Sequence, residues 1–184
     1  GGKARVISKL SIHKVIPLKV EGEMHYLTII EVHYVQRLPD LYFLPLCFIP
    51  TEGIFDKVEY TAMSVVCKAE IQGKTGFVMD SSYDQRFRDF LFGAMDRKLR
   101  VKDDEGILEF NSSIYAKLNA EKIDSKILKA DQSNTAIIYN DQFFFKFYRD
   151  IYIHIHIISC IFIILYITAA EFTNAVDKFS FFIY

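Results

Sequence analysis

Cysteine is scarce in this sequence. The three residues that occur, Cys47, Cys67 and Cys160, lie far apart and form no CxxC pair. An odd number at such spacings argues against a disulfide framework, and it argues against the paired-cysteine type of zinc site. We therefore expect no metal site from the sequence. The scarcity fits a reducing compartment, so we expect a cytoplasmic protein.

A strong charge of either sign is also missing. The net charge is −1 and the pI is about 6.6, so the composition does not indicate a nucleic-acid partner. The first ten residues, GGKARVISKL, are basic and too polar for a secretory signal peptide. Internal repeats and low-complexity linkers are absent as well.

Apolar and aromatic residues are plentiful. They make up 51% and 15% of the 184 residues, which is ample for a hydrophobic core. The length suits one ordinary domain or two small ones.

The first part of the chain has the composition of β-strands from Val6 to Cys67. Met24–Val35 and Asp40–Ile49 are rich in β-forming residues, and RLPD between them has the composition of a turn, so we predict an antiparallel hairpin. Further strands follow, with predicted breaks at Gly73 and Gly76.

A helix is predicted over Tyr83–Lys98, beginning near Ser82 or Asp84. Its apolar residues recur at intervals of three and four (Tyr83, Phe87, Phe90, Leu91 and Met95), so it is expected to pack on the sheet without a chemical role. The segment Arg100–Ser113 is predicted to be a loop or short hairpin, and its charged run Lys102–Glu105 to be solvated.

Three strands are predicted between Lys126 and Tyr148, with Asn140-Asp141 as a two-residue turn. On the last strand, alternation places Phe143, Phe145 and Phe147 on one face and Phe144, Lys146 and Tyr148 on the other. Both faces are expected to be largely buried. A lysine among aromatic residues is costly to bury unless an anion meets it.

Two interpretations of Lys146 follow. Its stem could lie on the aromatic side chains while its amine reaches water. Alternatively, backbone N–H groups of the preceding polar turn cover the phosphates of a nucleotide, and the lysine pairs with them. The turn QSNT alone decides nothing, because serine and asparagine are common in turns.

The segment LKADQSNTAIIYNDQFFFKFYR resembles the signature region of bacterial maltokinases, including those fused to trehalose synthase. The segments GGKAR, YLTIIEVHY, LYFLPLCF and GFVMDSSYDQRFRDFLFGAM resemble the amino-terminal cap region of that family, in the same order and spacing. The resemblance covers residues 1–149 and resumes weakly at AEFTNAVDKFSFFIY.

The resemblance implies an ATP-dependent sugar kinase that converts maltose to maltose 1-phosphate in trehalose and α-glucan metabolism. The implied fold is α+β: a β-rich cap with one main helix over residues 1–120, then part of a kinase-like amino-terminal lobe over residues 121–184. By position, Ser133, Asn134 and Thr135 would cover the phosphates and Lys146 would meet them. ATP, Mg²⁺ and maltose are the implied ligands, and a trehalose synthase domain is an implied partner.

The family's catalytic aspartate and metal-binding residues belong to the carboxy-terminal lobe. No catalytic residue is therefore assigned within these 184 residues, and we expect them to be inactive alone. The family's helix glutamate, which holds the strand lysine, would fall at about Cys160. No acid occurs between Asp150 and Glu171, so ATP binding is in question.

Residues 151–170 form an apolar segment without a formally charged side chain, long enough to span a bilayer as a helix. Its first half alternates like a strand, and we favour a buried segment over a membrane anchor. His154 and His156 share a strand face but lack a third metal ligand nearby, so we interpret them as exposed strand residues. The alternative to a kinase is a non-catalytic structural or interaction module, natural or designed, that keeps the cap fold.

Overall fold

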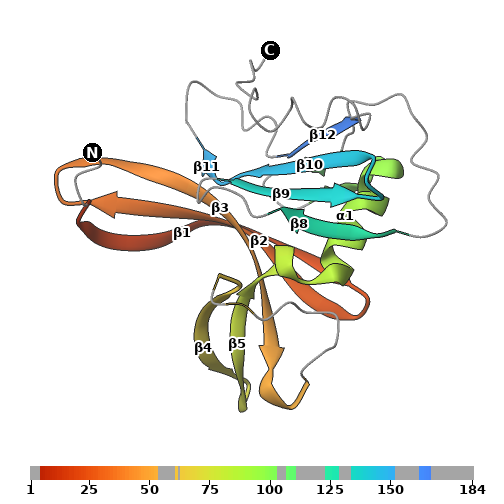
Figure 1. The fold of residues 1–184 in the computed structure, drawn as a ribbon. Helices are drawn as coiled ribbons and strands as arrows, with labels where there is room; N and C mark the ends of the chain where they lie inside the picture. The colour runs from red at the N-terminus through yellow and green to blue at the C-terminus, as the bar shows by residue number, and fades with distance from the viewer. Residues whose placement is uncertain are drawn as a thin grey trace.

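The computed structural model describes residues 5–53, 61, 63–102, 107–110, 123–128, 134–151 and 162–166. These residues form a sheet-rich α+β structure with one α-helix, as the sequence predicted. Figure 1 shows two main sheets, with the helix α1 (Gln85–Asp96) beside both of them. No helix among the described residues is long and apolar enough to cross a membrane.

The first sheet has the strand order β1-β2-β3-β5-β4, with the short strand β11 paired to β3. Its strands are all antiparallel to their neighbours. Their bounds are Ile7–Val20 for β1, Glu23–Tyr34 for β2, Arg37–Pro50 for β3, Val65–Ile71 for β4, Lys74–Asp80 for β5 and Asp150–Ile151 for β11.

The second sheet has the order β12-β10-β9-β8. Its strands are β8 (Ser125–Leu128), β9 (Asn134–Tyr139), β10 (Phe143–Tyr148) and β12 (Phe162–Tyr166). The first three confirm the strands predicted between Lys126 and Tyr148. Strands β6 (Arg100–Lys102) and β7 (Ile107–Glu109) form a separate short hairpin, one of the two forms predicted there. Two 3₁₀ turns, η1 (Thr51–Gly53) and η2 (Ser81–Tyr83), complete the described elements.

The predicted hairpin of β2 and β3 is confirmed, but its turn is not at RLPD. The strands reverse at Val35-Gln36, and residues 37–40 already belong to β3. Proline lacks a backbone N–H and is tolerated in a strand mainly at edges and bulges. Here Pro39 lies at the place where the register shifts, between the pairs Val32–Asp40 and Tyr34–Arg37. An irregularity in the ladder therefore accommodates the proline.

The turn between β4 and β5 and the turn between β9 and β10 were predicted correctly, whereas a further break predicted within β5 was not. Gln72 and Gly73 have φ values of 53° and 77° and separate β4 from β5, which confirms the break at Gly73. The break predicted at Gly76 is wrong, because Gly76 pairs inside β5 with Pro50 and Ala69. Asn140 and Asp141 both have φ near 52°, the left-handed conformation that such hairpin turns require.

The predicted helix is confirmed with tighter bounds. Asp84 is the residue at its N-cap, and its carboxylate accepts a hydrogen bond from the Arg86 backbone N–H at 2.9 Å. At the other end Lys98 has a φ of 50°, while the Leu99 N–H donates to the Ala94 carbonyl. This is a Schellman-type end, which satisfies carbonyls of the last helical turn.

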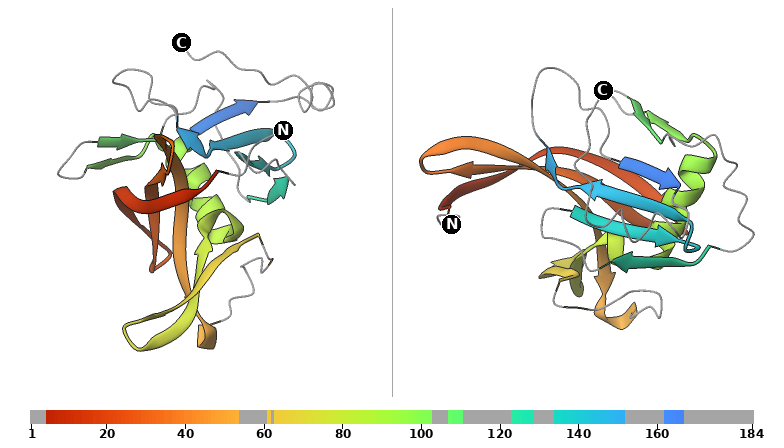
Figure 2. Two further views of the ribbon diagram at one scale, coloured as in Figure 1. Left: turned by 90° about the vertical axis from the view of Figure 1, so that its left-hand side faces the viewer. Right: turned by 45° about the horizontal axis from the view of Figure 1, so that its top comes forward.

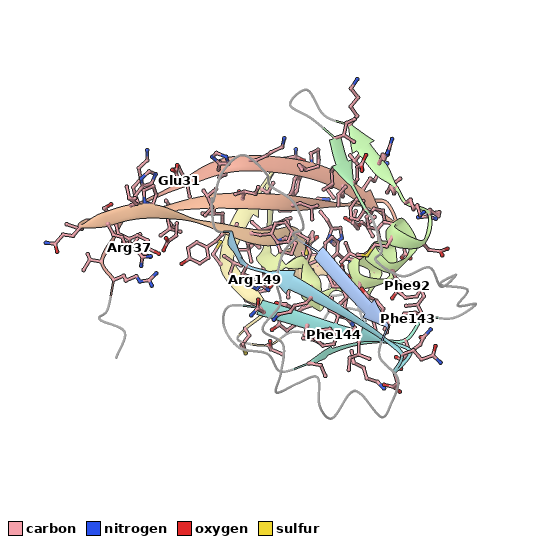
Figure 3. All side chains as sticks on the ribbon, turned by 90° about the horizontal axis from the view of Figure 1, so that it is seen from above. Glu31, Arg37, Phe92, Phe143, Phe144 and Arg149 are labelled. Atoms are coloured by element: carbon pink, nitrogen blue, oxygen red, sulfur yellow. The ribbon has the colours of Figure 1, made fainter. Side chains whose placement is uncertain are left out.

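The core lies where the first sheet, α1 and the second sheet meet. Phe92 of α1 packs against Phe143 of β10 with ring centroids 5.5 Å apart (Figure 3). Apolar side chains of all three layers form one buried cluster: Leu18, Val20, Leu27, Phe43, Phe87, Leu91, Phe92, Ala94, Met95, Phe110, Ile137, Tyr139, Phe143 and Phe145. The cluster contains residues from both sides of the predicted domain boundary near residue 120. That boundary lies outside the described residues and stays a prediction.

Much of β1 and the β2–β3 turn project from this core (Figures 1 and 2). Apolar side chains there are exposed, with Ile12 at 69% and Leu38 at 83%. Within the apolar segment 151–170, Ile151 belongs to β11 and Phe162–Tyr166 form β12. The described part of that segment is therefore strand rather than one continuous helix. The two histidines, His154 and His156, and the helix-glutamate position near Cys160 lie outside the described residues.

Candidate functional site

Lys146 lies in the middle of β10, where its neighbours are Ala136 of β9 and Ile163 of β12. Directly paired residues of antiparallel strands share a face of the sheet. The face that carries Lys146, called here the Lys146 face, therefore includes Lys126, Leu128, Asn134, Ala136, Ile138, Phe144 and Lys146. Lys146 and Phe144 are both half-buried.

Thr135 lies on the other face of β9, toward the core. Its side chain is only 6% exposed, and its hydroxyl accepts a hydrogen bond from Nε of Arg149 at 3.0 Å. Of the predicted phosphate-binding residues, the structure thus brings Asn134 to the side of Lys146 and places Thr135 on the opposite side. Ser133 lies outside the described residues. The phosphate-binding role of this set stays a prediction.

Arg149 connects the two sheets, a role that the sequence did not indicate (Figure 3). Its guanidinium pairs with the carboxylate of Asp80, the last residue of β5, as well as with Thr135 of β9. Its backbone carbonyl accepts a hydrogen bond from the Phe43 N–H of β3 at 2.8 Å. Arg149 is the last residue of the segment that resembles the kinase signature. Nothing in the sequence indicated that it would pair with Asp80, almost 70 positions earlier.

A second group of polar side chains is buried beneath the start of α1. His25 of β2, Cys47 of β3 and Asp84 are 0%, 3% and 1% exposed. His25 and Cys47 are direct partners across the two strands. One potential ligand atom from each of the three residues lies within 4.8 Å of the others. We call these three residues the buried triad.

Hydrogen bonds hold the buried triad in place. Nδ1 of His25 lies 3.0 Å from the hydroxyl of Ser81, while Nε2 has no hydrogen-bond partner among the described residues and lies 3.8 Å from Oδ2 of Asp84. The Asp84 carboxylate accepts hydrogen bonds from the Arg86 guanidinium at 2.5–3.2 Å. The imidazole also stacks on the Phe87 ring, with centroids 5.1 Å apart.

Burial sets the protonation of the imidazole and the thiol. It lowers the pKa of His25 to about 4, an effect that nearby Asp84 opposes and Arg86 reinforces. Burial raises the pKa of Cys47 to about 12, while a hydrogen bond with Ser81 acts in the opposite direction. Both groups are therefore neutral near pH 7 when no ion is bound, and the Asp84–Arg86 ion pair is adjacent.

Sequence reasoning missed the buried triad because it predicted the β2–β3 hairpin without a register and placed the turn at RLPD. The pairing of His25 with Cys47 follows from the turn at Val35-Gln36. A shift of one residue moves a strand's side chains to the other face, since they alternate between faces. The N-cap position of Asp84 was the one part of the group that the sequence indicated.

Comparisons with known proteins assign no family. No protein-family model matches the chain, and no curated protein matches it either.

Proposed function

We propose that this chain contributes the nucleotide-binding strands of a maltokinase-like sugar kinase and that ATP lies on the Lys146 face. The observation that supports this is the position of Lys146. It is a half-buried cation in the middle of an antiparallel sheet, flanked by the small residue Ala136 and near the apolar side chains of Ile138 and Phe144. Apolar surface beside a half-buried cation suits a ligand with a flat base and an anionic tail.

In this proposal the ammonium of Lys146 pairs with the α- and β-phosphates of ATP, and the adenine lies on the apolar strands. Asn134 is the predicted turn residue on the same face, so we expect its amide to contact a phosphate. Mg²⁺ would neutralise charge that develops on the transferred phosphoryl group. The sugar would be maltose, and the group phosphorylated would be its anomeric hydroxyl.

Substitution of Lys146 tests the proposal. Lys146→Met keeps an unbranched apolar stem and removes the charge, so the free energy of unfolding should change by about 1 kcal/mol or less. Binding of Mg-ATP, measured by calorimetric titration, should weaken about tenfold or more, because a hydrogen bond to a charged group contributes about 1.5–3 kcal/mol.

Lys126→Met is the matched control. Lys126 belongs to the same face but is exposed and pairs with Asp124 and Asp141, so its loss should leave ATP affinity within about twofold. Equal weakening by the two variants would indicate only general attraction of an anion. Absence of ATP binding to the unsubstituted chain would exclude the proposal and favour the non-catalytic module.

We expect binding without turnover. Phosphoryl transfer needs a residue that positions the sugar hydroxyl. The 184-residue sequence contains no HGD motif, the catalytic-loop motif expected to supply that residue. Incubation with maltose and Mg-ATP should yield no maltose 1-phosphate above a control without protein. Product formation that persists through repurification would show that the chain holds its own catalytic group.

A further inference from the structure

We propose that the buried triad of His25, Cys47 and Asp84 is a zinc site that fastens the start of α1 to strands β2 and β3. His25 belongs to β2, Cys47 to β3 and Asp84 to the N-cap of α1, and all three are buried. One potential ligand atom from each lies within 4.8 Å of the others. This site is independent of the proposed nucleotide site, since it belongs to the first sheet and the cap of the helix.

The orphaned nitrogen of His25 is the observation that points to a ligand. Nε2 is fully buried, has no hydrogen-bond partner in the part of the chain that the structure describes, and lies 3.8 Å from Oδ2 of Asp84. Buried polar atoms are nearly always satisfied, so an exception calls for an explanation. A cation bound between Nε2, the Cys47 sulfur and the Asp84 carboxylate would satisfy all three groups at once.

The surrounding contacts orient the triad for a metal ion. Ser81 is placed to accept the Nδ1–H of His25, the tautomer that leaves the lone pair of Nε2 available. Metal-bound histidines commonly have such a partner on their other ring nitrogen. The Arg86 guanidinium fixes the Asp84 carboxylate, whose Oδ2 lies 3.8 Å from Nε2 of His25.

Charge and chemistry select zinc. Binding would deprotonate the Cys47 thiol and release its proton to solvent, so that the ion would face one thiolate and the Asp84 carboxylate, which also pairs with Arg86. A mixed nitrogen, sulfur and oxygen set suits Zn²⁺, whereas Mg²⁺ and Ca²⁺ prefer oxygen ligands alone. Ligand bonds of about 2.0–2.3 Å bring donor atoms to roughly 3.3–3.8 Å from one another, so donor atoms now up to 4.8 Å apart need to close in by up to about 1.5 Å.

The experiment uses the full chain, stripped with EDTA and then titrated with ZnCl₂. We expect one equivalent of Zn²⁺ to bind, to be retained through gel filtration and to raise the melting temperature. Co²⁺ used in place of Zn²⁺ should give thiolate-to-cobalt charge-transfer absorption. Failure of the unsubstituted chain to bind zinc would overturn the proposal, and that result does not depend on whether any variant folds.

Variants then locate the ion. Cys47→Ser and His25→Gln should weaken zinc binding at least about 100-fold, which exceeds the typical effect of losing an outer contact. Cys67→Ser is the matched control, because Cys67 is exposed and lies outside the triad. A double His154→Gln/His156→Gln variant should also retain binding. Loss of binding in either control, or retention in folded Cys47→Ser, would overturn the assignment.

Discussion

At the scale of single residues, the two described cysteines should differ sharply in reactivity. Cys67 of β4 is exposed, whereas Cys47 is buried and its pKa is raised to about 12 by that burial. Only the thiolate reacts readily, so burial protects Cys47 twice, by blocking access and by keeping the proton on sulfur. We expect an alkylating reagent to modify Cys67 within minutes in native, EDTA-treated protein, and Cys47 only after unfolding.

Peptide mapping by mass spectrometry would measure this difference, and the same reaction in denaturant provides the control in which both thiols react. Rapid labelling of native Cys47 would show that β2, β3 and the helix start open readily. Such opening would also weaken the case for a fixed metal site, because preorganised ligands require a closed core.

At the scale of elements, the contact between β3 and β5 depends on one glycine. A Cβ on Gly76 would lie 2.4 Å from the Ile49 carbonyl oxygen and 2.7 Å from the Phe48 ring. Backbone cannot move aside as a flexible side chain can, so Gly76→Ala should lower the free energy of unfolding by about 1–3 kcal/mol. Urea denaturation monitored by circular dichroism would measure it.

Gly93 in α1 is the matched control. A Cβ there would meet only the Arg97 side chain, at 3.6 Å, which is ordinary contact. Gly93→Ala should therefore raise stability by about 0.5–1 kcal/mol, because alanine is the better helix former. Equal effects of the two substitutions, in sign and size, would contradict the close approach of β3 to Gly76.

The same elements show what the sequence could predict. Alternating β-branched and aromatic residues predicted the strands, and apolar spacing together with Asp84 predicted the helix, because these patterns follow from burial of one face. The turn between β2 and β3 was predicted at the wrong place, since RLPD has the composition of a turn although its residues belong to β3 and Pro39 lies at a strand irregularity. The buried triad depends on the register of β2 and β3, and local composition could not reveal it.

At the scale of the whole molecule, the two sheets share a core that the sequence did not predict. Phe143 and Phe145 belong to the same buried cluster as Leu18 and Leu27, which are far away in the sequence. Sequence periodicity indicates which face of a strand is apolar, but not which other face it packs against. The environment of Lys146 depends on the same stacking. The face of β10 that carries Phe143 and Phe145 belongs to the core, whereas Phe144 and Lys146 on the other face are half-buried.

The last prediction concerns the polar contact that joins the sheets. Arg149 pairs with Asp80 where both side chains are largely buried, at 16% and 6% exposure. Removal of one partner leaves the other charge buried without compensation, which typically costs about 3–5 kcal/mol. We expect Arg149→Met and Asp80→Asn each to destabilise strongly, and the double variant to be less destabilised than the sum by about 1–3 kcal/mol.

Urea unfolding of the four proteins in this double-mutant cycle would measure the coupling. Arg5→Met and Asp40→Asn form the control cycle, because that ion pair lies on the projecting part of the first sheet and Arg5 is exposed. Its coupling should be below about 1 kcal/mol. Coupling near zero for Arg149 and Asp80 would mean that the apolar core alone holds the sheets together. Strong coupling would mean that Thr135 and its neighbours on β9 are held to the first sheet through Arg149, which in turn fixes the orientation of the Lys146 face.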